Sequence, residues 1–272
     1  MAKYKKKRAR ELQHDKFRDT AISILDRIGN RLEGKGRTIL YGLIGVVVLG
    51  ALIALYMQWS NRKSDEARRA LGRAITIART EITGEGLPGT PPPTGPTFGS
   101  SRERAERAIQ EFEKVAAKYG DPYQSEARYF IATNRLYVDR DKGISELTEL
   151  SKSEIAEVAT LSKFALAQAK EADSKYDEAA QLYSEIARLN SSIVTADTAN
   201  VRLAEVYHKQ GKTKEASDLL FNIVEASRTA KDPDGQSATP SVAAGAAAQK
   251  LEKLDPERYA KLTPAAPTDL PF

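Results

Sequence analysis

This 272-residue sequence contains no cysteine, and it has only two histidines, two methionines and one tryptophan. Without cysteine there is no disulfide, no thiolate metal site and no cysteine nucleophile. The histidines, His14 and His208, fall on either side of a predicted membrane span, so we do not expect them to share a metal ion. No P-loop, HExxH or GxSxG motif occurs. We therefore expect no enzymatic activity, no metal and no cofactor.

Net positive charge is confined to the N-terminal region. The chain carries a net charge of +5, and residues 1–38 hold 12 Lys and Arg against five acidic residues. The remaining residues are therefore net negative by two. Asp and Glu there alternate with Lys and Arg at helical spacing, as on solvated helix faces. This balance argues against nucleic acid as a partner of the large C-terminal region.

The N-terminal tail, residues 1–38, combines a basic run with an amphipathic segment. Lys3–Arg10 contains six basic residues, which suit nucleic acid, a nuclear signal or the anionic cytoplasmic face of a membrane. The neighbouring apolar run favours the membrane. Residues 14–33 carry an apolar stripe at helical spacing: Phe17, Ala21, Ile24, Leu25, Ile28 and Leu32. We expect an amphipathic helix that binds either lipid or a partner protein.

One long stretch, Ile39–Trp59, lacks charge altogether. It has 21 residues, of which eleven are Leu, Ile or Val. At about 1.5 Å per helical residue it matches the hydrocarbon thickness of a bilayer. Tyr41 near one end and Tyr56 and Trp59 near the other suit the headgroup level. The stretch predicts one transmembrane helix.

Two other interpretations of this stretch are weaker. A signal peptide would have a shorter apolar region and small residues for cleavage. A buried core helix is seldom apolar on every side over this length. Basic residues within 15 positions are nearly equal on the two sides, and the full basic tail decides the orientation. We expect a single-pass protein of a bacterial inner membrane, with its N-terminus cytoplasmic and its C-terminal domain periplasmic.

The region 60–262 contains a repeat. Ala108, Ile144, Ala179 and Ala216 align at spacings of 36, 35 and 37 residues. Apolar residues recur four and seven positions later, except after Ile144, where Thr148 and Ser151 are polar. Upstream stand the pairs Ile131-Ala132, Leu166-Ala167 and Leu203-Ala204. Each unit is predicted to be an antiparallel helix pair, with turns at Asp139–Lys142, Ser174–Tyr176 and Gly211–Lys212.

Further elements extend this array at both ends. An earlier unit is predicted from Asp65–Ile82, with Leu71-Gly72 and Ile75 in the matching places, and Arg102–Lys118. A proline-rich insertion, residues 84–101, separates its two helices. A final helix, Val242–Leu254, follows a turn at 232–235, and the tail 263–272 is expected to be disordered.

These units resemble the tetratricopeptide repeat (TPR). The resemblance rests on Leu203-Ala204, Tyr207, Gly211 and Ala216, and is repeated more weakly in the preceding units. The whole arrangement is similar to the YfgM-like ancillary subunits of the SecYEG translocon, single-span bacterial TPR proteins. The resemblance implies an all-α fold, one N-terminal transmembrane helix followed by a TPR-like solenoid of helical hairpins. It also implies a place near the translocon.

A solenoid without a catalytic site binds partners on its concave surface, which the first helices line. The predicted partner-binding residues are Glu126, Tyr129, Thr133, Leu136 and Tyr137 in one unit, Leu161, Phe164, Gln168 and Glu171 in the next, and Thr198, Val201, Glu205, His208 and Lys209 in the third. Leu161 and Phe164 either face this groove or pack between units. The Lys/Asn set with which TPR domains clamp a peptide carboxylate is missing, so an extended or helical segment held by aromatic and aliphatic side chains is expected.

The predicted function is a non-enzymatic, membrane-anchored protein that binds polypeptides or assembly factors in its groove. The alternative is a structural scaffold of an envelope complex, for division or secretion, that assembles through its span and tail. Gly50 and Ala54 are spaced for a close helix–helix contact in the membrane. They therefore suit either a dimer seam or an ordinary span.

Overall fold

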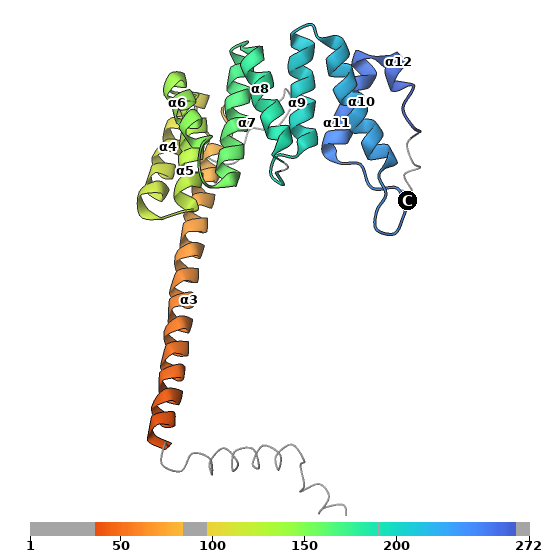
Figure 1. Ribbon diagram of the computed structural model, residues 1–272. Helices are drawn as coiled ribbons and strands as arrows, with labels where there is room; N and C mark the ends of the chain where they lie inside the picture. Colours follow the sequence, from red (N-terminus) through yellow and green to blue (C-terminus); the bar gives the residue numbers. More distant parts are fainter. Residues whose placement is uncertain (1–35, 84–96, 190, 265–272) are drawn as a thin grey trace, which may run out of the picture. The chain divides into compact units, whose positions relative to one another are not determined.

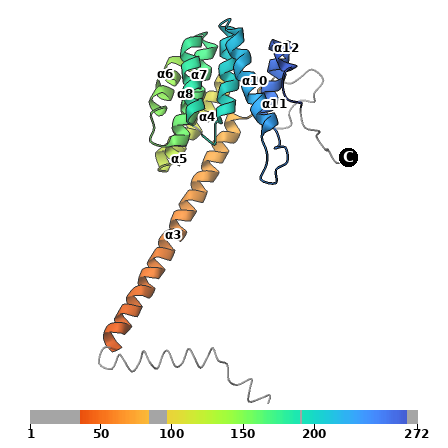
Figure 2. The same cartoon turned by 45° about the vertical axis from the view of Figure 1, so that its right-hand side comes forward.

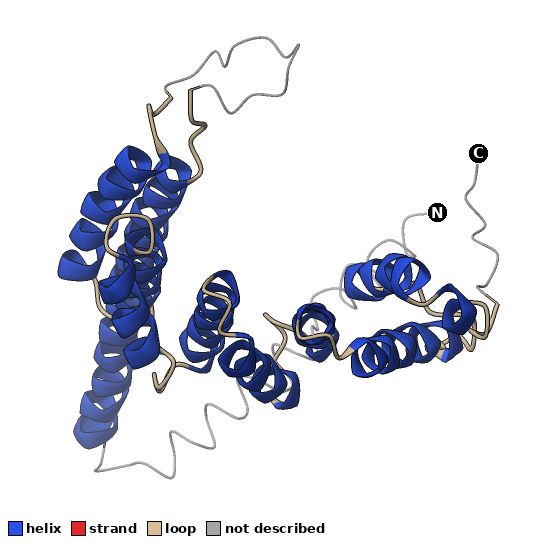
Figure 3. Ribbon diagram, turned by 90° about the horizontal axis from the view of Figure 1, so that it is seen from above, coloured by secondary structure: helices blue, strands red, loops and turns tan. Residues whose placement is uncertain are grey.

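The computed structural model describes residues 36–83, 97–189 and 191–264, and these residues form an all-α protein (Figure 1). The chain divides into two compact units, Met1–Asp65 and Glu66–Phe272. The amphipathic helix predicted at 14–33, most of the proline-rich insertion and most of the C-terminal tail lie outside the described residues. Figure 3 shows every regular element of the described part as helix, which confirms the predicted fold class for the repeats.

Helix α3, Gly36–Ala78, contains the whole uncharged stretch as continuous helix. Within that stretch, side chains are described for residues 48–53, 57 and 58, and Leu49, Leu52 and Met57 are more than half exposed. Among the described residues, none of the helices has both the length and the apolar character needed to cross a membrane.

The second unit continues as a succession of helices (Figures 1 and 2), joined by short connections except for the longer loop 230–241 between α10 and α11. They are α4 (Ser101–Lys118), α5 (Tyr123–Arg135), α6 (Arg140–Leu150), α7 (Ala156–Ala172), α8 (Tyr176–Arg188), α9 (Ala196–Lys209), α10 (Thr213–Thr229), α11 (Val242–Leu254) and α12 (Pro256–Tyr259). Each helix from α4 to α12 packs against the next, so the helix pairs predicted from the repeat are confirmed.

Polar side chains define where several helices begin. The side-chain oxygens of Ser100, Asp139, Thr195 and Ser241 each accept a hydrogen bond from the backbone N–H three residues on, at the starts of α4, α6, α9 and α11. These bonds satisfy donors that the first helical turn leaves unpaired. Asp139 is thus the N-cap of α6, and the predicted turn at Asp139–Lys142 is wrong, since the chain turns at residues 136–138. The other two predicted turns match the α7–α8 and α9–α10 connections.

The core is divided into four clusters, each formed by a first helix, its partner and the first helix of the next pair. Leu71 and Phe112 belong to the cluster of α3, α4 and α5, and Leu147 to that of α5, α6 and α7. Tyr183 lies in the cluster of α7, α8 and α9, and Leu251 in that of α9, α10 and α11. Successive clusters share a helix, and this sharing makes the units a continuous array.

The repeat register predicted at Ile144 is wrong by one residue. Gly143 occupies the fourth position of α6, as Ala179 does in α8 and Ala216 in α10, and all three are buried. Counted from Gly143, the residues four and seven positions later are Leu147 and Leu150, in place of the polar Thr148 and Ser151. A Cβ atom at Gly143 would lie 2.8 Å from the backbone nitrogen of Leu136, so α5 and α6 approach too closely for alanine. Because glycine has no apolar side chain, the sequence pattern did not identify Gly143 as the anchor position of this unit.

The first helix pair differs from its prediction in two ways. Its first helix ends at Ala78 rather than Ile82, and Gly72 is exposed while Leu71 and Ala74 are buried. Beyond the helix, Ile82 forms an isolated parallel bridge with Phe98. The backbone N–H of Thr83 donates to the carbonyl oxygen of Phe98 at 2.8 Å, and the hydroxyls of Thr83 and Thr97 lie 2.7 Å apart. We call these residues, 82–83 and 97–98, the neck of the insertion.

The C-terminal end of the array contains the predicted turn, the predicted α11 and one unpredicted helix. Gly235, with φ of 77°, lies in the turn between α10 and α11, and Lys231 pairs with Ser237 across that turn. The short helix α12 follows α11, with Asp255 as its cap. Leu262 is buried in the last core cluster, so ordered chain extends to the end of the array.

Candidate functional site

The predicted residues on α5 and in the turn after it lie in mixed environments. Tyr129 packs edge-on against Phe130, with ring centroids 5.2 Å apart, and burial raises the pKa of its phenol. Tyr129 and Leu136 are both partly buried against the core cluster of α5, α6 and α7. Burial also raises the pKa of the Glu126 carboxyl, although the charge of Arg68 lowers it. Tyr137 is 59% exposed, and the Thr133 hydroxyl donates to a backbone carbonyl. Tyr137 is thus the member of this set most accessible to a partner.

The predicted residues on α7 are mostly directed into the core. Leu161 and Phe164 pack against the cluster of α7, α8 and α9, and Phe164 meets Tyr183 edge-on at 5.7 Å. They therefore pack between units, the second of the two roles expected for them. Glu171 is buried as well, whereas Gln168 is exposed. A partner would reach this helix through Gln168.

The predicted residues on α9 follow its length. Val201 is buried in the core, and Thr198 lies in the first turn, where its N–H and hydroxyl contact the Thr195 cap. Glu205 is partly buried, and His208 and Lys209 are exposed. The C-terminal half of α9 is thus the part of this set that combines polar chemistry with access.

A buried carboxylate links α7, α8 and α9. Glu171 Oε1 accepts from Lys209 Nζ at 2.8 Å, and its Oε2 accepts from Arg202 at 2.8 Å and from the Tyr183 hydroxyl at 3.1 Å. Arg202 also pairs with Glu205. Glu205 Oε1 in turn contacts Lys250 Nζ of α11 at 2.5 Å. We call these residues of α7, α8, α9 and α11 the charge network.

The charge network shifts the pKa values of its members. Burial disfavours the ionised form of Glu171, but the hydrogen bond from Lys209 and the charge of Arg202 outweigh it and lower the pKa of the carboxyl. Burial raises the pKa of Tyr183 to about 12. Glu171 is therefore ionised and Tyr183 neutral at pH 7. The buried side chains of the network bind one another, which points to a structural role for this part of the predicted site.

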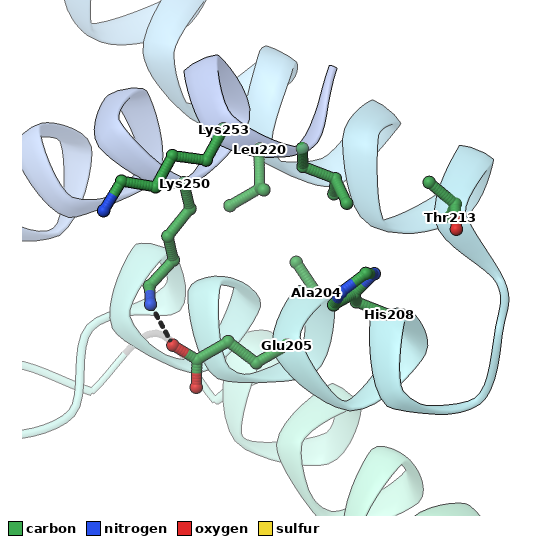
Figure 4. Close-up of a pocket in the computed structure, with 8 residues that line it drawn as sticks. Ala204, Glu205, His208, Thr213, Leu220, Lys250 and Lys253 are labelled. Atoms are coloured by element: carbon green, nitrogen blue, oxygen red, sulfur yellow. Dashed lines mark ion pairs between the residues drawn. The ribbon is translucent and has the colours of Figure 1, made fainter.

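A cavity of about 510 Å³ lies between α9, α10 and α11 (Figure 4). The predicted residues Glu205 and His208 line it from α9, Leu220 from α10, and Lys250 and Lys253 from α11. Figure 4 shows the two ammonium groups on one side of the cavity, His208 on the other, and Leu220 between them. The volume is typical of a ligand pocket.

The lysines of α11 were not predicted as site residues. The sequence predicts α11 only as the final helix of the array, and the predicted partner-binding residues lie on, or directly after, the three preceding first helices α5, α7 and α9. Lys250 and Lys253 are three residues apart and so share a helix face, a signal that extending the count to α11 would have found. Among the described residues, no cluster of His, Asp and Glu is arranged to hold a metal ion.

No protein-family model and no curated protein sequence matches this chain. Among solved structures, it is similar to a Podosopora anserina protein, described as a kinesin light chain with nearly identical TPR-like repeats. The TM-score is 0.43 at 16% sequence identity, over 56% of this chain and 77% of the other. A point variant of the same protein matches equally.

Proposed function

We propose that this protein is a non-enzymatic binding protein, anchored in a bacterial inner membrane, whose helical array holds polypeptides or assembly factors at the periplasmic face. The observation that carries the binding role is the cavity between α9, α10 and α11, which α9 lines with two of the predicted residues, Glu205 and His208. A pocket formed where two first helices meet over a second helix suits the side chains of a bound segment. A place near the Sec translocon is part of the proposal and rests on the sequence resemblance.

The anchoring role is supported by the uncharged stretch Ile39–Trp59 and by its continuous helical backbone within α3. The basic tail before it supports a cytoplasmic N-terminus. In cell fractionation, the chain should stay in the membrane pellet after alkaline carbonate and be released by detergent. A reporter fused after Phe272 should be active only outside the cytoplasm. Release by carbonate would contradict the anchor, and cytoplasmic reporter activity would contradict the orientation.

The binding role is tested by photocrosslinking in living cells. A photoactivatable amino acid at His208, on the cavity wall, should label one or a few proteins, as should one at exposed Tyr137. The matched control is Gln181, an exposed position on the second helix α8. Labelling that is equal at His208, Tyr137 and Gln181 would contradict a binding role for the predicted residues.

A further inference from the structure

The cavity between α9, α10 and α11 joins an apolar surface to a cationic one. Leu220, Leu254 and Ala204 supply the apolar wall. Lys250 and Lys253 bring their ammonium groups to the same side, as Figure 4 shows. A ligand that fills this volume therefore meets an aliphatic contact and positive charge at once.

The positive charge is in excess. Lys250 is bound to Glu205, but Glu205 is shared with Arg202, which also contacts Glu171. Lys209 contacts Glu171 as well. The charge network and Lys253 thus place four cations against two carboxylates. Among the described residues, no carboxylate pairs with Lys253.

We propose that this cavity binds a partner polypeptide segment in which an acidic side chain stands two residues from an aliphatic one. This inference rests on the proposed binding function and names the chemistry of the partner. In an extended segment, residues two apart point to the same side. The carboxylate then binds Lys253 and competes with Glu205 for Lys250, while the aliphatic side chain packs on Leu220 and Leu254.

Because Glu205 competes with the ligand carboxylate for Lys250, removing the Glu205 charge should strengthen binding rather than weaken it. Lys250 is 42% exposed and Glu205 20% exposed, so an incoming carboxylate reaches the lysine from the solvent side. Replacing Glu205 by glutamine frees Lys250 and removes a repelling charge, while Arg202 keeps its contact with Glu171. Loss of the Glu205 charge from the cavity wall is therefore expected to tighten binding of an acidic segment.

The probe is a fluorescent peptide in which two glutamates and two leucines alternate at every second position, with glycine or serine at each position between them, so that each glutamate stands two residues from a leucine. It is titrated with the full chain in detergent. Fluorescence anisotropy should show saturable binding that weakens as salt is raised, because exposed charges are screened. Peptides with glutamine for glutamate, or serine for leucine, should bind more weakly. Equal binding of all three peptides would overturn the proposal, as would succinate alone competing as well as the peptide.

Three variants, each with a single charged side chain replaced by glutamine, test the site itself. Lys253→Gln should weaken peptide binding about threefold, the range of an exposed ion pair, and Glu205→Gln should strengthen it about threefold. Lys214→Gln, which removes an exposed lysine that does not line the cavity, should leave the affinity unchanged. Thermal unfolding of each variant checks its fold. If Glu205→Gln weakens binding in a folded protein, or if the effects of Lys253→Gln and Lys214→Gln are equal, the proposal fails.

The outcome separates this inference from the proposed function. Crosslinking at His208 reports on any partner, whereas the peptide titration reports on acidic–aliphatic chemistry alone. Specific crosslinks together with a peptide affinity that ignores charge would retain the binding role and reject this partner. If the chain self-associates and Lys253→Gln abolishes this self-association, the occupant of the cavity is a second copy of the chain. That result would also reject the proposed partner segment.

Discussion

At the residue scale, Glu171 is the centre of the charge network, and removing its charge should destabilise the array. Glu171→Gln leaves Arg202 and Lys209 without their shared carboxylate at a 6% exposed site. We expect the free energy of unfolding to fall by about 1–3 kcal/mol, as measured by urea denaturation of the full chain in detergent. The control is Glu178→Gln, whose carboxylate pairs with Lys170 at the surface and whose loss should leave stability near the wild type. Equal effects would contradict a special role for Glu171.

The same carboxyl group predicts a pH dependence. Its pKa is lowered in the folded protein from an ordinary value of 4.5, so its contribution is present above that value and is lost as pH falls through the folded pKa. The stability difference between wild type and Glu171→Gln should therefore be constant near neutral pH and vanish in acid. A difference that persists at acid pH would show that packing, rather than charge, explains the variant.

Tyr183 predicts the opposite, alkaline limit. Because burial raises its pKa from 10.0 to about 12, the folded state retains the phenol proton, and stability declines as pH rises above 10.0. Tyr183→Phe should cost about 1 kcal/mol at neutral pH through the hydrogen bond to Glu171. It should also flatten the alkaline decline. Parallel pH curves for the two proteins would argue against this titration.

At the scale of single helices, the α5–α6 crossing depends on Gly143. Gly143→Ala puts a Cβ atom 3.0 Å from the carbonyl oxygen of Ala132 and 2.8 Å from the Leu136 nitrogen, so we expect destabilisation of about 1–3 kcal/mol. Gly245→Ala, in α11 with no neighbour within 4 Å of the added atom, should stabilise by about 0.5–1 kcal/mol. Thermal melts of both variants test this contrast, and a shift of the same sign would refute it.

The turns after α7 and α9 offer a second matched pair. Ser174 and Gly211 hold the same left-handed position, with φ of 58° and 77°, and the next residue donates to the carbonyl five residues back in each. A side chain in this conformation costs about 1 kcal/mol. Ser174→Gly should therefore raise the free energy of unfolding, and Gly211→Ser should lower it. If the two variants shift the free energy of unfolding in the same direction, the two turns do not share this left-handed conformation.

Helix positions were largely predictable from the sequence, because the small–large spacing of the repeat marks each crossing. The bounds of α11 were predicted in full, and those of α4 to within one residue. The α6 register failed since glycine gives no apolar signal, and the helix ending at Ala78 could not be separated from the insertion that follows. The lysines of the cavity and the pairing of Glu171 with residues 31 and 38 positions away depend on packing between units. Periodicity within one helix carries no information about either.

At the scale of the whole array, stability should be distributed unevenly. Each core cluster is shared by consecutive helices, whereas the last one is bounded by the short helix α12. Leu251→Ala, at a fully buried site, should cost about 2–5 kcal/mol locally. Hydrogen exchange should then increase in 213–262 and stay unchanged in 101–135. A uniform increase across both ranges would indicate that the array unfolds as one cooperative body.

The neck at Ile82 and Phe98 bears on how this protein can tolerate change. Because the Thr83–Phe98 backbone bond and the Thr83–Thr97 hydroxyl contact close the loop at its base, the length of chain beyond them enters stability only through a slowly growing entropy of closure. Lengthening or shortening this segment should therefore leave the packing of Leu71 and Ala74 against α4 intact. An epitope or fluorescent domain inserted between residues 84 and 96 should leave the stability of the array nearly unchanged. This position is therefore suited to labelling the protein in cells.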